Sequence, residues 1–132
     1  MSTTVVVLIG ALVVGLAFLV MTLSTSMDKA LRRAKAEKSI QPVLEAVGKK
    51  RMPGRASAYN FAIRRLWDGY ERGLALELIK ELAKSHADTR IAQYWLGQAL
   101  NVEPALARET LSEDFLAAHF KPEVAAQCGP VS

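Results

Sequence analysis

The stretch that decides the fold is "SAYNFAIRRLWDGYERGLALELIKELAKSH", residues 57–86. In its first half, apolar residues recur at the spacing of one helix face, at Tyr59, Ala62, Ile63, Leu66 and Tyr70. After Gly73 the same spacing begins again at Leu74 and continues to the end of the stretch. Apolar residues three and four positions apart lie on one side of an α-helix. The sequence therefore predicts two amphipathic helices joined by a short turn.

Towards the carboxyl terminus, further helix starts follow at short intervals. Asp88 or Thr89 can cap one helix and Ser112 another, and Pro104 fits the first turn of a further helix. The alternation of apolar and polar residues that is typical of strands is absent from the sequence. We therefore predict an all-α fold, with a domain of antiparallel helical hairpins at residues 56–120 and a flexible tail at 121–132.

The amino-terminal region has a different character. Residues 5–23, "VVVLIGALVVGLAFLVMTL", carry no charge, and a helix of about 20 apolar residues can cross a bilayer core of about 30 Å. A buried helix in so small a protein would normally show a polar stripe. We therefore expect a single transmembrane helix at residues 1–26. A signal peptide and a soluble core helix are the alternatives, although "MSTT" lacks the positive charge of a signal peptide.

Directly after this stretch the chain becomes basic. Residues 28–55 hold nine basic and three acidic residues, a net charge of +6. Because positive flanks stay on the cytoplasmic side, we expect the amino terminus outside and the domain in the cytoplasm. Residues 27–55 would form a basic juxtamembrane stalk and linker. Its cations are expected to contact anionic lipid headgroups: Lys29, Arg32, Arg33, Lys35, Lys38, Lys49, Lys50 and Arg51.

One segment of the predicted domain resembles a known repeat family. In "AQYWLGQAL", residues 92–100, Leu96 and Gly97 match the Leu-Gly pair of a tetratricopeptide repeat, and Leu100 matches the large residue three positions on. The resemblance covers roughly residues 58–116 as two degenerate units, and Trp67 stands where the first unit would have its glycine. It implies stacked helix pairs whose concave face binds a peptide or another subunit, without chemistry of its own.

Candidate contact residues come from the aromatic and basic side chains of the predicted domain. Phe61 and Trp67 lie off the main apolar stripe of their helix, and the neighbouring arginines would supply a charged rim for an acidic partner. The partner-binding candidates are Phe61, Arg64, Arg65, Trp67 and Tyr94. The alternatives are that the aromatics belong to the core and that the arginines form a solvated helix face.

Small residues suggest places where helices approach closely. Ala11 and Gly15 form a small-xxx-small pair within the apolar stretch. Gly97 would have the same role inside the domain, because the repeat that it resembles uses this glycine for helix packing. We therefore name Ala11, Gly15 and Gly97 as helix-packing residues.

Nothing in the sequence points to catalysis. His86, His119 and Cys128 do not have the spacing of a zinc site, and "GKKRMPGR", residues 48–55, lacks the Ser or Thr of a phosphate-binding loop. The basic segment has no interleaved aromatic residues on which bases could stack. We therefore expect no enzyme activity, cofactor, metal, small-molecule substrate or nucleic acid.

Two functions remain. The first is a membrane-anchored adaptor or scaffold that docks a partner protein at the membrane surface, which the linker-like "GKKRMPGRAS" at residues 48–57 favours. The alternative is a small single-span accessory subunit of a larger membrane complex, of the respiratory or photosynthetic type. The pair of Ala11 and Gly15 favours this alternative.

Overall fold

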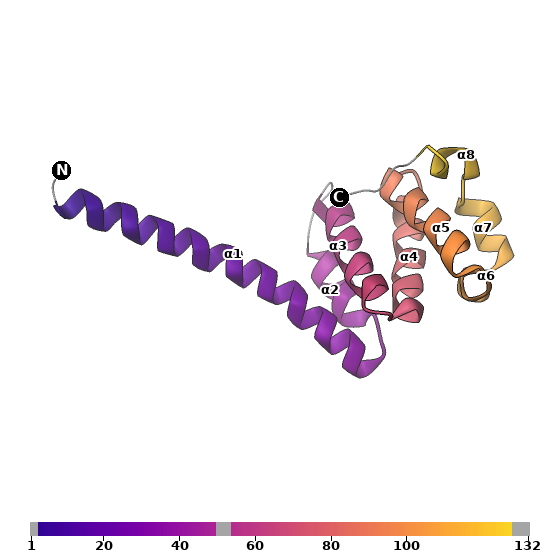
Figure 1. Ribbon diagram of the computed structural model, residues 1–132, viewed down its shortest axis with the longest axis horizontal. Helices are drawn as coiled ribbons and strands as arrows, with labels where there is room; N and C mark the ends of the chain where they lie inside the picture. The colour runs from indigo at the N-terminus through magenta and orange to yellow at the C-terminus, as the bar shows by residue number, and fades with distance from the viewer. Residues whose placement is uncertain (1–2, 50–53, 128–132) are drawn as a thin grey trace.

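In the computed structural model, helices joined by short turns make up the part of the chain that is described, and this part contains no strand. The structure describes residues 3–49 and 54–127, except for the side chains of residues 3–5, 8 and 15–26. Figure 1 shows one long helix extending from a body of shorter helices that pack side by side. The elements are α1 (Thr3–Glu37), α2 (Gln41–Gly48), α3 (Gly54–Asp68), α4 (Arg72–His86), α5 (Arg90–Val102), α6 (Pro104–Leu111), α7 (Glu113–His119) and α8 (Pro122–Ala125). The predicted all-α class is confirmed.

The prediction of a membrane anchor is wrong. Among the described residues, no helix has the length and apolar character that a membrane crossing requires. This finding contradicts the expected transmembrane helix at residues 1–26. It also contradicts the single-pass topology and the cytoplasmic placement of the domain, because both depended on that helix. The apolar stretch and the first basic residues after it form one continuous helix, since α1 runs from Thr3 through Asp28 to Glu37.

The two ends of α1 have different surroundings. Near its amino-terminal end apolar side chains are exposed, among them Leu12 at 74% and Val14 at 69%. Near its carboxyl-terminal end Leu31 and Ala34 are buried in the core, where α1 packs against α2 and α3. The last turns of α1 are therefore part of the domain.

Residues 27–49 do not form the separate stalk that we expected. Pro42 lies in the first turn of α2, as its fixed backbone angle favours, and Val43 and Val47 are fully buried. The helix packs against both α1 and α3. Among the described side chains, the core includes Met27, about thirty residues before the predicted boundary at 56. Residues 50–53, the middle of the predicted linker, lie outside the described residues.

A buried polar pair joins α3 to α5 in the middle of the body. Trp95 Nε1 donates a hydrogen bond of 2.8 Å to Asn60 Oδ1, and both side chains are buried. Because an unpaired polar group at this depth would cost free energy, the bond favours one relative placement of the two helices. The indole of Trp95 also packs against Trp67, with 5.8 Å between the ring centroids.

The local helix signals towards the carboxyl terminus are confirmed. The Thr89 hydroxyl accepts a hydrogen bond from the Ala92 N–H at the start of α5, and the Ser112 hydroxyl accepts one from the Phe115 N–H at the start of α7. Pro104 is the first residue of α6. These are the caps and the proline position that the residue types predict.

A second buried polar side chain holds the end of the chain on the body. Gln93 Nε2 donates to the carbonyl oxygens of Ala87 and His119, at 2.7 and 2.9 Å, and Gln93 Oε1 accepts from the Lys121 N–H at 2.8 Å. We call these three bonds the Gln93 anchor. We expected a flexible tail from residue 121, whereas the structure has α8 there, packed on α5.

Candidate functional site

A groove runs between the carboxyl-terminal part of α1 and α3. Its volume is about 750 Å³, within the range of about 300–1,000 Å³ that is usual for ligand-binding pockets. Basic, acidic and apolar side chains all contribute to it. We call it the α1–α3 groove, and its lining residues are Asp28, Leu31, Arg32, Lys35, Phe61, Arg64, Arg65, Asp68 and Gly69.

The spacing of these residues explains how the sequence builds the groove. On α1 the lining residues follow the series i, i+3, i+4 and i+7 from Asp28 to Lys35, and on α3 they follow the same series from Phe61 to Asp68. This series marks one face of a helix. Each helix therefore presents one stripe, composed of one apolar, two basic and one acidic residue.

The apolar residues of the groove are unequally accessible. Leu31 is 5% exposed, whereas Phe61 is 41% exposed. The Arg65 guanidinium lies over the Phe61 ring, with its Cζ 5.0 Å from the ring centroid. The Arg64 guanidinium lies over the Trp95 ring at 5.7 Å. The groove thus offers an aromatic ring, Phe61, with the Arg65 guanidinium next to it.

Positive charge is in excess in the groove. Four cations, Arg32, Lys35, Arg64 and Arg65, line it with two carboxylates, Asp28 and Asp68. Arg32, Lys35 and Arg65 form no ion pair with any carboxylate in the part of the chain that the structure describes. A cluster in which cations outnumber carboxylates attracts anionic groups.

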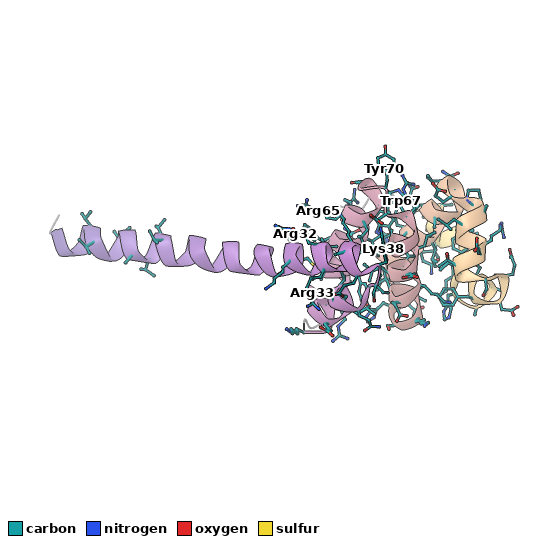
Figure 2. All side chains as sticks on the ribbon, turned by 90° about the horizontal axis from the view of Figure 1, so that it is seen from below. Arg32, Arg33, Lys38, Arg65, Trp67 and Tyr70 are labelled. Carbon is teal, nitrogen blue, oxygen red and sulfur yellow. The ribbon has the colours of Figure 1, made fainter. Side chains whose placement is uncertain are left out.

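Several basic residues outside the groove have ion pairs. Arg33 lies on α1 beside Arg32 but pairs with Glu37 at 3.5 Å. Figure 2 shows Arg32 and Arg65 on the same side of α1 and Arg33 on the other. Six cations elsewhere have ion pairs: Arg33–Glu37, Lys38–Glu71, Arg72–Glu103, Lys84–Glu81, Arg108–Glu113 and Lys121–Asp88.

One end of the groove is formed by the carboxyl terminus of α3. The Glu71 N–H donates to the Leu66 carbonyl oxygen and the Tyr70 N–H to the Trp67 carbonyl oxygen, which is the bond pattern of a Schellman motif. Tyr70 has a φ of 61°, the left-handed conformation that glycine usually supplies. Its side chain is 85% exposed and points away from the body in Figure 2. The helix ends at Asp68, so Tyr70 is not on the buried face where its spacing had placed it.

Gly69 allows Lys35 to reach this end of the groove. A Cβ atom at Gly69 would lie 3.5 Å from Lys35 Nζ and only 3.1 Å from the Arg65 carbonyl oxygen. The ammonium group therefore sits close to the last turn of α3, where the negative end of the helix dipole favours a cation.

The predicted contact residues separate into two groups. Phe61, Arg64 and Arg65 line the groove. Trp67 is 6% exposed, packs on Trp95 and is covered by the Arg72 guanidinium, whose Cζ is 4.1 Å from the ring centroid. Its expected role as a partner contact is therefore corrected to one in the core.

Tyr94 also lies apart from the groove. It is partly buried against the core, and its ring meets Trp95 edge-on with a centroid distance of 5.3 Å. For Trp67 and Tyr94 the alternative interpretation, that the aromatics belong to the core, is therefore the correct one, because Trp95 of α5 packs against both rings.

The residues predicted to face lipid do not form one surface. Arg32 and Lys35 line the groove, whereas Arg33 and Lys38 are in ion pairs. Lys29 and Lys49 are exposed, and Lys50 and Arg51 lie outside the described residues. The helical twist distributes these cations around α1, which sequence proximity does not reveal.

The predicted packing residues also have different outcomes. Ala11 is exposed, and the surroundings of Gly15 lie outside the described side chains. Gly97 does lie at a close contact, since a Cβ atom there would be 3.3 Å from the Ala125 Cβ. Its neighbour is α8, a helix that the sequence analysis did not predict.

Comparison of the chain with protein-family models, with curated proteins and with solved structures gives no significant match. Across the described residues, no three His, Cys, Asp or Glu side chains are grouped so that they could hold a metal ion. The resemblance to tetratricopeptide repeats stays a prediction.

Proposed function

We propose that the protein is a helical adaptor whose domain binds a segment of a partner protein in the α1–α3 groove. One observation carries this proposal: the groove combines an exposed aromatic ring, Phe61, with basic side chains from two neighbouring helices. Exposed aromatic residues and arginines are the usual energetic centres of protein interfaces. The membrane part of the sequence-based hypothesis is not retained, because it depended on the transmembrane anchor.

The proposed role is non-catalytic. The groove contains cations, carboxylates and apolar carbon but neither a histidine, a cysteine nor a serine, so its residues offer charge and contact area rather than a nucleophile with a base. Docking in a groove between helices also fits the function that the repeat resemblance implies.

To test the proposal, displayed random peptides of about ten residues are selected for binding to the full chain. We expect the selected peptides to bind at least about tenfold more weakly to Phe61→Ala, because truncation removes the central ring. Val102→Ala is the matched control, since Val102 is an apolar side chain of similar exposure, 44% against 41%, on α5. Selected peptides that bind both variants as tightly as the unaltered chain would refute docking in the groove.

A second candidate function is supported by the exposed end of α1. Val6, Val7, Leu12, Val13 and Val14 are each more than half exposed, and contiguous exposed apolar surface usually marks an interface. The chain would then be an accessory subunit whose partner subunits cover α1. A cooperative thermal unfolding transition of the isolated full chain would favour the adaptor, and the absence of a transition would favour the subunit.

A further inference from the structure

We propose that the occupant of the α1–α3 groove is an acidic segment of a protein, whose carboxylates bind Arg32, Lys35 and Arg65 and whose apolar side chain packs on Phe61. This inference rests on the proposed docking function and adds the chemistry of the partner. It depends on three features of the groove: the cations that lack an ion pair, the position of Arg65 beside Phe61, and the excess of cations over carboxylates.

Three cations without an ion pair meet in the groove, whereas Lys29, Lys49 and Lys80, which also lack one among the described residues, lie outside it. Six cations elsewhere have a carboxylate partner within the chain, whereas Arg32, Lys35 and Arg65 have none among the described residues. Asp28 and Asp68 line the same groove without forming these pairs. Like charges held on one face repel one another. A carboxylate supplied by a ligand would remove this repulsion and form the missing pairs.

Arg65 lies beside the apolar part of the groove. Its guanidinium Cζ is 5.0 Å from the Phe61 ring centroid, which is within the distance of a cation–π contact. A guanidinium can bind both oxygens of a carboxylate, so one ligand can place a carboxylate on Arg65 and an apolar side chain on Phe61. The same ring still has an accessible surface, since Phe61 is 41% exposed.

The charge balance favours a protein segment over a polyphosphate. Four cations and two carboxylates line the groove, an excess of only two positive charges. Nucleic acid binding relies on many phosphate contacts, and Asp28 and Asp68 would repel a continuous phosphate backbone. A peptide can place its few carboxylates at the cations and an apolar side chain between them.

A flat anionic membrane is also a poorer fit. Lipid headgroups are best bound by cations on one common surface, whereas Arg33 points to the other side of α1 from Arg32 and Arg65 (Figure 2). The unpaired cations are recessed in a groove with an aromatic ring, which suits an extended segment.

The experiment measures the binding of two fluorescent peptides to the full chain by anisotropy. The first has a central Phe flanked on both sides by Asp and Glu, and the second replaces every Asp and Glu by Asn and Gln. We expect the acidic peptide to bind at least about tenfold more tightly, and to lose at least about tenfold in affinity when salt rises from about 0.05 to about 0.5 M.

Charge-reversal variants locate the binding. Arg65→Glu and Lys35→Glu should each weaken binding of the acidic peptide by at least about tenfold. Arg33→Glu is the matched control, because it makes the same charge change one residue from Arg32 on the other side of the helix. It should change the affinity by less than about threefold. Circular dichroism verifies that each variant is folded, and either of the two groove variants suffices for the test.

The outcomes separate the two proposals. If the acidic peptide binds no better than the neutral one, or if Arg33→Glu weakens it as much as Arg65→Glu, the acidic-segment inference is overturned. Docking in the groove still stands in that case, provided that the selected peptides depend on Phe61. Binding to vesicles containing phosphatidylserine, lost in Arg65→Glu, without binding of the acidic peptide, would assign the cations to lipid and overturn the inference.

Discussion

The α1–α3 groove and the Gln93 anchor are both built from polar side chains between helices, yet their chemistry is opposite. Gln93 is fully buried, and its amide nitrogen and oxygen both have hydrogen-bond partners. In the groove Arg32, Lys35 and Arg65 are exposed and lack ion pairs among the described carboxylates.

The difference follows from solvent access. A buried amide that loses its partners also lacks water to replace them, so the anchor is needed for stability. Exposed cations are solvated, and leaving them unpaired costs the folded state little. We infer that the anchor contributes to folding and that the groove contributes to binding. Substitutions in the two regions should therefore affect different measurements.

The largest effect is expected at the anchor. Gln93→Leu leaves the carbonyl oxygens of Ala87 and His119 and the N–H of Lys121 without their partner, which should lower the free energy of unfolding by about 2–4 kcal/mol. Thermal or urea unfolding of the full chain measures it. The control is Gln98→Leu on the same helix, where we expect a change within about 0.5 kcal/mol. Equal losses in both variants would contradict the assigned role of the anchor.

A smaller effect is expected where α8 meets α5. Gly97→Leu should push Ala125 away, since even a Cβ atom would lie 3.3 Å from its Cβ. Overpacking costs about 1–3 kcal/mol, and the better helix propensity of leucine offsets up to about 1 kcal/mol. We expect a net loss of about 1 kcal/mol, because α8 is short and can move aside.

Hydrogen exchange provides the readout for this variant. The amides of Ala125 and Ala126, which donate within α8, should exchange faster in Gly97→Leu, and the rest of α5 should be unaffected. Gly73→Leu is the control, since nothing lies within 4 Å of a Cβ at Gly73. Unchanged exchange in α8 would show that Gly97 has no packing role.

At the end of the groove a substitution should increase stability. Tyr70 adopts a φ of 61°, and the left-handed conformation costs a non-glycine residue about 1–2 kcal/mol. Glycine removes this cost but adds about 0.4–1 kcal/mol of unfolded-state entropy. Tyr70→Gly should therefore stabilise the fold by about 0.5–1 kcal/mol in urea unfolding. Tyr70→Ala is the control, because alanine must adopt the same left-handed conformation but lacks the aromatic ring. An equal gain in stability in this variant would rule out backbone strain as the cause.

The smallest effect on stability is expected for the unpaired cations. Arg32→Gln removes a charge that has no ion pair among the described residues. The free energy of unfolding should therefore change by less than about 0.5 kcal/mol. Binding of the acidic peptide should nevertheless weaken several-fold. A loss of stability as large as that of Gln93→Leu would abolish the distinction between the two regions.

The sequence predicted some parts of the site and missed others for identifiable reasons. Phe61, Arg64 and Arg65 were recognised because they lie off the apolar stripe of their own helix. Their counterparts Asp28 and Leu31 were missed, although α1 repeats the spacing of α3 from Asp28 to Lys35. That repetition is visible in the sequence, but the assumption of a membrane anchor assigned those cations to lipid.

Gln93 and Trp67 show a different limit. Gln93 and Gln98 lie on one predicted helix, and only the return of residues 119–121 to α5 distinguishes the buried one. Trp67 lies off the stripe just as Phe61 does, but Trp95 and Arg72 cover it. Both outcomes depend on contacts between residues far apart in the chain, which periodicity does not encode.

By itself the sequence determined the helices of the predicted domain and several of their starts, at Thr89, Pro104 and Ser112, because helix periodicity and capping act over a few neighbouring residues. The tertiary structure decided that α1 and α2 belong to the core, that α8 covers Gly97, and that two equally spaced stripes face each other across one groove. The physical reason is that a groove requires the relative placement of two helices. That placement is set by long-range packing and by buried hydrogen bonds such as Trp95 to Asn60, which form only when the whole chain folds.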